Sequence, residues 1–376
     1  MRLRAGAILA SVVTLVAVGC TPTTTGPTPG APNLTVSTVL GGLDHPWEVA
    51  FLPDGTMLVT ERAGRIDAVV GGAKRVLAAP ADVSPSSEGG MLGLAVDPSF
   101  VTNRRIYACF ESNLSGALDE RVVRFTVSAD LTSLTNRADI VTGIPLNNTG
   151  NPGRHSGCRL RFGPDNALWI TTGDGVRSDT AQNPASLGGK ILRVNSDGAA
   201  AVGNPGGALD PRVYTLGHRN VQGLSFRPSD GRAFSIEQGT NCDDEVNLPA
   251  PGANFGWNPG AAGFYNEFAP MTDTASVPGA VSAIWSSGCP TIATSGGSFI
   301  SGSQWGAWDG ALVLASLAGT QLRVVQFTAG ATPTFAQQWT AVTDQGRLRT
   351  ATQGPDGNLY LLTDANPGSI LKLTPT

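Results

Sequence analysis

The sequence predicts an all-β protein, a six-bladed β-propeller of four-stranded antiparallel blades. Two observations lead to this prediction. Charged residues make up only 14% of the 376 residues, whereas the chain contains 48 glycines and 26 prolines, a composition that favours short strands and tight turns over amphipathic helices. A hairpin-like pattern also recurs six times, at intervals of some tens of residues, which suits propeller blades.

Each copy of the pattern is a short apolar run, a turn rich in Pro, Asp and Gly, a second apolar run and a polar end. WEVAFLPDGTMLVTE is the first copy and RTATQGPDGNLYLLTD the last. Proline presets φ for the second turn position, the aspartate side chain caps the turn, and glycine accepts the left-handed conformation that closes a hairpin. Each copy is therefore predicted to be a β-hairpin. The copies begin at Trp47, Met91, Cys158, Val221, Gly296 and Arg349.

Hairpins of this size cannot bury their own apolar faces, so they must pack against one another. A stacked solenoid is the alternative to a propeller, but the long irregular inserts between the copies suit blade loops better. Residues 34–40 are predicted to form the outer strand of the last blade and to close the ring, which leaves no free sheet edge. Residues 34–376 are therefore interpreted as one β-propeller domain.

The N-terminus has the features of an export signal. Two arginines precede an apolar run, residues 5–18, that is too short to span a membrane comfortably, and a lipobox-like Gly-Cys follows. We interpret residues 1–20 as a signal peptide with a lipobox and residues 21–33 as a flexible Thr/Pro/Gly tether. The expected location is the cell envelope, with a lipid anchor at Cys20. Cleavage and free secretion is the alternative, because Ala17 is a less usual residue three positions before the cysteine.

Cysteine usage agrees with export. If Cys20 is lipidated, four cysteines remain, and an even number in an oxidising compartment indicates two disulfides, although four cysteines permit three pairings. There is no C-x-x-C spacing, so a zinc site is not expected. Cys109 and Cys158 lie in consecutive hairpins, whereas Cys242 and Cys289 lie in loops that flank the candidate site. We predict that each of these two couples forms a disulfide.

The chain has a net charge of −4 and no basic cluster that would neutralise a phosphate backbone, so a small-molecule partner is expected rather than nucleic acid.

The candidate catalytic base is His155. Propeller loops converge on the central channel at one face of the ring, where ligands usually bind. His155, in NPGRHSGCRLRFGPD, directly precedes an inner-strand run and can take a hydroxyl proton near neutral pH. A surface or structural histidine is the alternative.

Two further loops are dense in polar residues. YTLGHRNVQGLSF places Arg219 and Asn220 together, where donors suit a bound oxyanion or quinone or satisfy buried carbonyls. EQGTNCDDEVN offers calcium either side-chain carboxylates or the backbone carbonyls of the Gly239-Thr240 turn. A solvated acidic loop is the alternative, and no EF-hand spacing is present. The carboxylates in this loop are Glu237, Asp243, Asp244 and Glu245.

Arg347 and Arg349, in DQGRLRT, form a candidate anion site. They alternate along the start of a predicted strand, so their side chains should point to the same face. Two guanidinium groups directed together need an anion, which a cofactor with several carboxylates would provide. Structural salt bridges are the alternative interpretation.

These segments, in this order, resemble the glucose/sorbosone dehydrogenase family, which includes the soluble quinoprotein glucose dehydrogenases and the aldose sugar dehydrogenases. The resemblance extends from Leu43 to the C-terminus. It implies an oxidoreductase that converts the C1 hydroxyl of an aldose to a lactone, using pyrroloquinoline quinone (PQQ) beside a calcium ion. The segments on which it rests are GLDHPWEVAFLPDG, EGGMLGLAVDPSF, GKILRVNSDG, GHRNVQGLSFRP, DDEVNLPAPGANFGW and QGPDGNLYLLTD.

The resemblance also implies roles for individual residues. His155 matches the family's base, which removes the hydroxyl proton while hydride passes from the same carbon to C5 of the quinone. Arg219 and Asn220 match the pair that contacts the reactive quinone oxygens, and Arg219 would stabilise the reduced quinone. Gly239 and Thr240 match the turn whose carbonyls hold calcium. The other implied cofactor contacts are Glu88, Thr291, Arg347 and Arg349.

Four positions differ from the best-studied glucose oxidisers of the family. Glu88 replaces a glutamine, Arg154 replaces an acidic neighbour of the base, Thr240 replaces a proline, and Ala318 falls where a cofactor-contacting lysine is common. The alternatives are a cell-surface binding module that has lost the cofactor and a calcium-dependent lactonase-like hydrolase. The rim loop 258–274 contains no motif that names the sugar, and the electron acceptor has no recognisable motif either.

Replacing Cys20 with Ser is expected to release the protein from the membrane fraction, because the predicted lipid is attached to the cysteine side chain. Cell fractionation and mass spectrometry of the mature N-terminus measure this. Wild-type protein that is already soluble and has an unmodified N-terminus would contradict the anchor.

Overall fold

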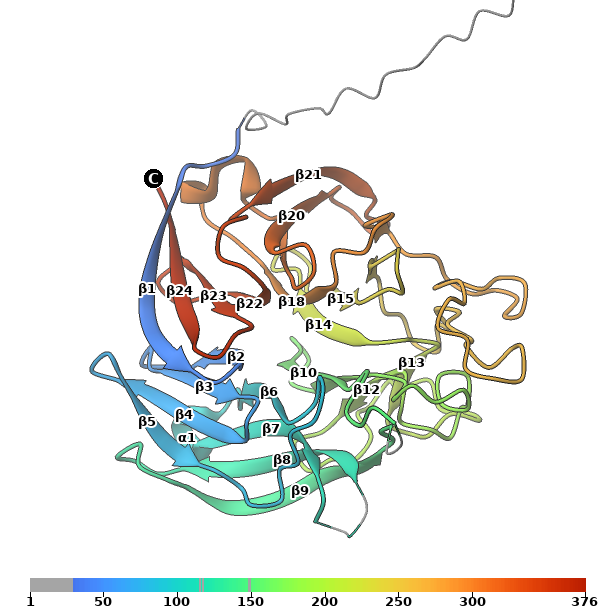
Figure 1. The fold of residues 1–376 in the computed structure, drawn as a ribbon, viewed down its shortest axis with the longest axis horizontal. Coiled ribbons are helices and arrows are strands. Elements are labelled where there is room, and N and C mark those ends of the chain that lie inside the picture. The colour runs from blue at the N-terminus through green and yellow to red at the C-terminus, as the bar shows by residue number, and fades with distance from the viewer. Residues whose placement is uncertain (1–29, 115, 117, 148–149) are drawn as a thin grey trace, which may run out of the picture.

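The computed structural model describes residues 30–376 apart from positions 115, 117 and 148–149 (Figure 1). The predicted signal peptide and the tether up to residue 29, including Cys20, lie outside the described residues. In the described part of the chain, no helix has the length and apolar character needed to cross a bilayer.

The described residues form six four-stranded antiparallel sheets arranged in a ring around a central axis, which confirms the predicted six-bladed propeller (Figure 1). Blade 1 contains β2 (Pro46–Phe51), β3 (Met57–Glu61), β4 (Arg65–Val70) and β5 (Ala73–Ala78). Blade 2 contains β6 (Met91–Val96), β7 (Arg105–Ser112), β8 (Asp119–Val127) and β9 (Leu134–Ile144). Blade 3 contains β10 (Gly157–Phe162), β11 (Leu168–Thr172), β12 (Lys190–Val194) and β13 (Val213–Leu216).

The second half of the ring repeats this arrangement. Blade 4 contains β14 (Val221–Phe226), β15 (Ala233–Glu237), β16 (Glu245–Asn247) and β17 (Trp285–Ser286). Blade 5 contains β18 (Thr294–Phe299), β19 (Leu312–Ser316), β20 (Gln321–Phe327) and β21 (Phe335–Ala341). Blade 6 contains β22 (Leu348–Gln353), β23 (Leu359–Thr363), β24 (Gly368–Pro375) and β1 (Leu34–Leu43). Two short helices, α1 (Phe100–Asn103) and the 3₁₀ helix Ser303–Trp308, lie between strands.

The six predicted hairpins are the two innermost strands of the six blades. In the first copy the Asp54 carboxylate accepts a hydrogen bond from the Thr56 amide at 2.9 Å, and Gly55 has φ +85°, as expected for a turn closed by glycine. The last copy repeats this chemistry, since Asp356 accepts from the Asn358 amide at 3.2 Å. Local turn chemistry therefore explains why these residues form hairpins.

Ring closure uses the N-terminal strand. β1 pairs antiparallel with β24, with Leu34 opposite Pro375, so the first strand of the chain completes the last blade, as predicted for residues 34–40. The innermost strands contact one another in a closed cycle, and the apolar core lies as layers between neighbouring blades. The expectation of no free sheet edge is wrong for the inner strands, because each is the end strand of its own four-stranded sheet. These short edges face the centre of the ring, where the neighbouring blades protect them.

Both predicted disulfides are present. Cys109 on β7 pairs with Cys158 on β10 and so joins blade 2 to blade 3. Cys242 pairs with Cys289 and joins the loops that precede and follow the outer strands of blade 4.

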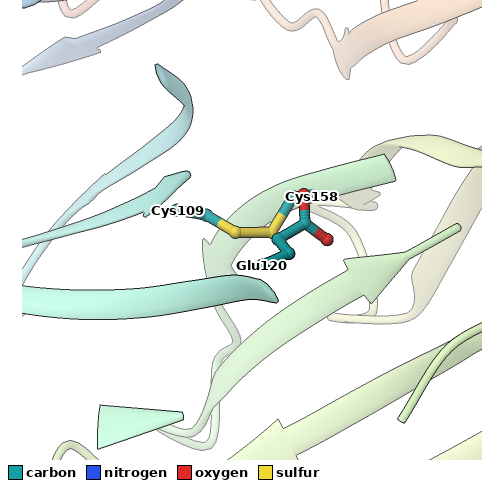
Figure 2. A group of neighbouring side chains, drawn as sticks. All are labelled: Cys109, Glu120 and Cys158. Carbon is teal, nitrogen blue, oxygen red and sulfur yellow. A yellow bond between two sulfur atoms is a disulfide. The ribbon is translucent and has the colours of Figure 1, made fainter. Parts of the chain in front are cut away.

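Glu120 on β8 lies beside the Cys109–Cys158 disulfide (Figure 2). Its side chain is fully buried, and neither carboxyl oxygen has a hydrogen-bond partner in the described structure. Burial raises the pKa of Glu120 well above its ordinary value, and Glu111 and Asp119 add to the effect. The two sulfurs are bonded to each other, so this group is not a metal site. Burial and the two neighbouring carboxyl groups instead favour the protonated form of Glu120.

We expect Glu120→Gln to raise the melting temperature at about pH 8 and to leave it nearly unchanged at about pH 4. A carboxyl whose pKa is raised by folding contributes full stability below its ordinary pKa, and this contribution is lost as the pH rises through the raised value. Glutamine cannot ionise. Thermal melts of both proteins over this range measure the difference, with the exposed Asp344→Asn as the matched control. Parallel pH profiles of wild type and Glu120→Gln would show that Glu120 does not titrate in this way.

Candidate active site

The predicted site residues gather at one edge of the ring. The first two strands of each blade are antiparallel, so the start of the first strand and the end of the second lie at the same edge. His155 and Arg347 shortly precede β10 and β22, whereas Gly239 follows β15. At this edge lies a cavity of about 650 Å³. Its lining includes four predicted cofactor contacts, Glu88, Thr291, Arg347 and Arg349, together with Ala318.

Three arginines in this cavity share one carboxylate. Asp364, just after β23, lies 3.2 Å from Arg347 Nη2, 3.1 Å from Arg349 Nη2 and 3.7 Å from Arg62 Nη1. Burial would raise the pKa of Asp364, but Arg349, Arg62 and Arg347 lower it to about 2. Asp364 and Glu88, the two carboxylates that line the cavity, cannot together neutralise three guanidinium groups. The cavity therefore has positive charge to offer a ligand, and the sequence interpretation had missed Arg62 and Asp364.

Amide side chains connect the arginines to the rest of the site. Gln222 Oε1 accepts a hydrogen bond from Arg349 Nη1 at 2.8 Å, and Gln222 Nε2 donates to Glu88 at 3.3 Å. Asn220, which is fully buried, also donates to Glu88 at 3.1 Å and accepts from the Gly157 amide at 3.1 Å. Asn220 and Glu88, predicted from separate motifs, are thus in direct contact.

The acidic loop after β15 does not assemble a side-chain metal site. Asp244 is fully buried and accepts from the Gly239 amide at 3.0 Å, from the Thr291 hydroxyl at 2.8 Å and from the Ile292 amide at 2.8 Å. Asp243 accepts from a serine hydroxyl, and Glu237 binds His218. Among the described residues, the one group of three side chains with metal-ligating atoms close together is Cys109, Glu120 and Cys158, far from this loop in the sequence.

The turn itself remains a candidate for holding a cation through its backbone. Asp244 ties Gly239 to Thr291, and Thr291 lines the cavity. A Cβ atom at Gly239 would lie 2.2 Å from the Cys242 carbonyl oxygen, so only glycine fits this turn. In the described structure the carbonyls of Gly239 and Thr240 accept no backbone hydrogen bond, which leaves them available to a cation.

His155 is held in one orientation by Asp174. Its Nδ1 atom lies 2.9 Å from Asp174 Oδ1, and the side chain is only 2% exposed. Asp174 is fully buried and accepts two further hydrogen bonds, from Trp257 Nε1 at 2.7 Å and from the Tyr265 hydroxyl at 2.9 Å. Burial would raise the pKa of Asp174, but His155, the Trp257 hydrogen bond and the charge of Arg219 lower it. A carboxylate at Nδ1 leaves Nε2 free to accept a proton.

Arg219 lies beside this histidine. Its backbone amide donates to Glu237, its Nη1 donates to the Gln238 carbonyl at 3.2 Å, and its guanidinium lies 5.6 Å from the Trp257 ring. Its Nη2 contacts Glu267, a residue of the rim loop 258–274. Neither His155 nor Arg219 lines the arginine cavity, because Tyr265 and Glu267 of the rim loop contact them.

Several site residues were not singled out from the sequence. Asp174 ends the same hairpin repeat that follows His155, and its position at a strand end at this edge was the available signal. Arg62 occupies the equivalent strand end of blade 1. Tyr265 and Glu267 lie in an insert of turns and bends without periodicity, so no pattern pointed to them.

Comparisons with known proteins identify a family and similar relatives. A family model described as Glucose / Sorbosone dehydrogenase matches residues 43–372. The aldose sugar dehydrogenase of Escherichia coli is 31% identical over 348 residues, which cover 89% of this chain and 91% of that protein. Quinoprotein glucose dehydrogenase B of Acinetobacter calcoaceticus is 31% identical over 266 residues, which cover 62% of this chain and 54% of that protein.

Solved structures are similar over nearly the whole chain. The PQQ-bound form of aldose sugar dehydrogenase from Streptomyces coelicolor matches with a TM-score of 0.76 and 32% identity, covering 93% of this chain and 99% of that one. The apo-form of the Escherichia coli aldose sugar dehydrogenase matches with a TM-score of 0.79 and 29% identity, covering 92% of this chain and 100% of that one. This chain belongs to the glucose/sorbosone dehydrogenase family.

Proposed function

We propose that this sugar dehydrogenase is PQQ-dependent and oxidises the C1 hydroxyl of an aldose to the lactone, with Ca²⁺ beside the quinone. The observation that supports this most strongly is the cavity in which Arg62, Arg347 and Arg349 share the single carboxylate of Asp364. A ligand with several carboxylates would complete this charge arrangement. The similarity to a PQQ-bound aldose sugar dehydrogenase supports the same cofactor.

The cavity residues fit such a ligand. Arg347 and Arg349 would bind its carboxylates. Arg62 lines the same cavity as Ala318 and would supply a cation in place of the lysine that is common at the position of Ala318. Thr291, Asn220 and Glu88 would contact its polar atoms, and the Gly239 and Thr240 carbonyls would hold the calcium ion. When bound, PQQ supplies a quinone carbon that accepts hydride, and Ca²⁺ polarises the adjacent carbonyl.

The protein supplies the proton acceptor. Because Asp174 occupies Nδ1 of His155, Nε2 is the nitrogen that accepts the proton of the sugar hydroxyl. The Asp174 carboxylate then stabilises the imidazolium and prevents the ring from turning. Arg219 Nη2 is the nearby charged donor that would stabilise negative charge as the hydroxyl loses its proton and the quinone is reduced.

A cell-surface binding module without the quinone is the second candidate. It is favoured by Glu88 and Ala318, which place a carboxylate and a small apolar side chain in the cavity where the resemblance leads one to expect an amide and a cation. A lactonase-like hydrolase would require several carboxylates around one ion, and the described side chains at this edge do not form such a group.

The location in the cell envelope with a lipid anchor at Cys20 is also a proposal. The two disulfides of the described structure support folding in an oxidising compartment. The expected partners are a sugar, an electron acceptor that the sequence does not identify, and a membrane reached through the lipid alone.

His155→Gln is expected to lower turnover by roughly 10²- to 10⁴-fold, because glutamine keeps a hydrogen-bonding group but cannot accept the proton. Quinone binding should survive, since His155 does not line the cavity. Dye reduction with an aldose and fluorescence titration of the apoprotein with PQQ measure the two effects separately. Turnover within a few-fold of wild type would exclude His155 as the base.

Arg347→Ala is expected to weaken PQQ binding by roughly 10- to 100-fold, the loss of one charge-assisted contact. Arg347 suits this test because its side chain is half-exposed, so its removal leaves the core intact. Calorimetry of the apoprotein with PQQ and calcium measures the affinity. Arg177→Ala, which removes an exposed arginine outside the cavity, is the matched control. If wild type shows no saturable binding, the binding-module hypothesis replaces the enzyme.

A further inference from the structure

One oxygen atom of the rim loop occupies the space in front of the free nitrogen of His155. Glu267 Oε1 accepts a hydrogen bond from Arg154 Nη2 at 2.6 Å, contacts Arg219 Nη2, and lies 3.9 Å from His155 Nε2. Two guanidinium groups and the candidate base, from blades 3 and 4, therefore surround a single atom. Glu267 belongs to the insert between β16 and β17.

This atom lies where a reacting oxygen would have to bind. A hydroxyl that gives its proton to Nε2 must come within hydrogen-bond reach of that nitrogen, and the charge that develops on the oxygen needs cationic donors. The position of Glu267 Oε1 offers both. Glu267 Oε1 and His155 Nε2 are 3.9 Å apart, beyond hydrogen-bond distance, whereas a hydroxyl in this position could approach Nε2 closely and donate to it.

The Glu267 side chain is able to leave this position. It is 26% exposed, in contrast to the 2% exposure of His155 and the 4% exposure of the Arg219 side chain. The loop around it is turns and bends, and Phe264 and Phe268 on either side are 63% and 69% exposed rather than packed. The loop backbone is anchored on both sides of Glu267, by Tyr265 through Asp174 and by Ala269 and Met271, which pack in a buried cluster with Trp257. Displacement therefore requires only the Glu267 side chain to turn.

We infer that Arg154, Arg219 and Nε2 of His155 form an oxygen-binding subsite that the chain fills with its own Glu267 until a ligand displaces it. Two guanidinium groups are the chemistry that binds a carboxylate. The subsite therefore accepts small carboxylates and sugar acids once Glu267 is removed. The identification of the natural displacing ligand as the sugar hydroxyl rests on the proposed function.

Binding of sodium acetate and sodium gluconate to the apoprotein tests the subsite without quinone, calcium or turnover. Glu267→Ala should bind both carboxylates with a dissociation constant on the order of millimolar, at least about tenfold tighter than wild type, whose subsite is filled. Calorimetry at constant ionic strength, with sodium chloride as the reference salt, measures this. Adding Arg154→Ala to Glu267→Ala should abolish the gain, because one of the two cations is lost.

Two further variants keep the test decisive. Glu267→Gln preserves size and should show a smaller gain if Glu267→Ala proves unstable, while Asp179→Asn removes an exposed carboxylate outside the cluster and should show none. Equal carboxylate affinity in wild type and both Glu267 variants would overturn the subsite.

In quinone-loaded enzyme, Glu267→Ala should lower the KM for a neutral aldose, and a raised KM would overturn the displacement step. Failure of wild type to bind PQQ would instead overturn the proposed function and leave the carboxylate result standing.

Discussion

The ion pair between Glu48 and Arg159 holds the centre of the propeller together. Arg159 of β10 is fully buried, donates to Glu48 of β2 at 2.5 Å and to the Gln222 carbonyl of β14 at 2.9 Å, and lies 3.9 Å from the Trp47 ring. Burial would raise the pKa of Glu48, but Arg159 and Arg161 lower it, so the carboxylate stays charged. Three blades thus meet at one guanidinium, and removal of either partner would leave an uncompensated buried charge.

The site is built directly on this contact. Gln222 accepts from Arg159 through its backbone and from Arg349 through its side chain, and the same side chain donates to Glu88. The orientation of the cavity arginines therefore depends on where the inner strands are held. Hydroxyl groups reinforce the ring between neighbouring blades, since Thr171 donates to the Val221 carbonyl at 2.7 Å. A rigid support of this kind is what a preorganised charge site needs.

The edge of the ring that carries the candidate site has two parts, one open and one covered by the rim loop. The arginine cavity is open and lined by strand ends, whereas His155 and Arg219 lie beneath the rim loop. Under the proposed function, a sugar that reaches His155 would take the place now held by Glu267, so substrate selection would depend on the rim loop rather than on the blades. The proposed cofactor contacts and the proposed substrate contacts could then vary independently, because different segments provide them.

The sequence by itself determined the hairpins, the ring closure by residues 34–40, the two disulfides and the family, because turn chemistry, apolar alternation and ordered motifs are local properties. Only the tertiary structure decided which side chains meet. Asp243 and Asp244 are adjacent in sequence yet accept from Ser286 and Thr291 respectively, whereas Arg154 and Glu267 are 113 positions apart and form a salt bridge. Such contacts depend on how loops from different blades converge at one edge of the ring, and no local pattern encodes that convergence.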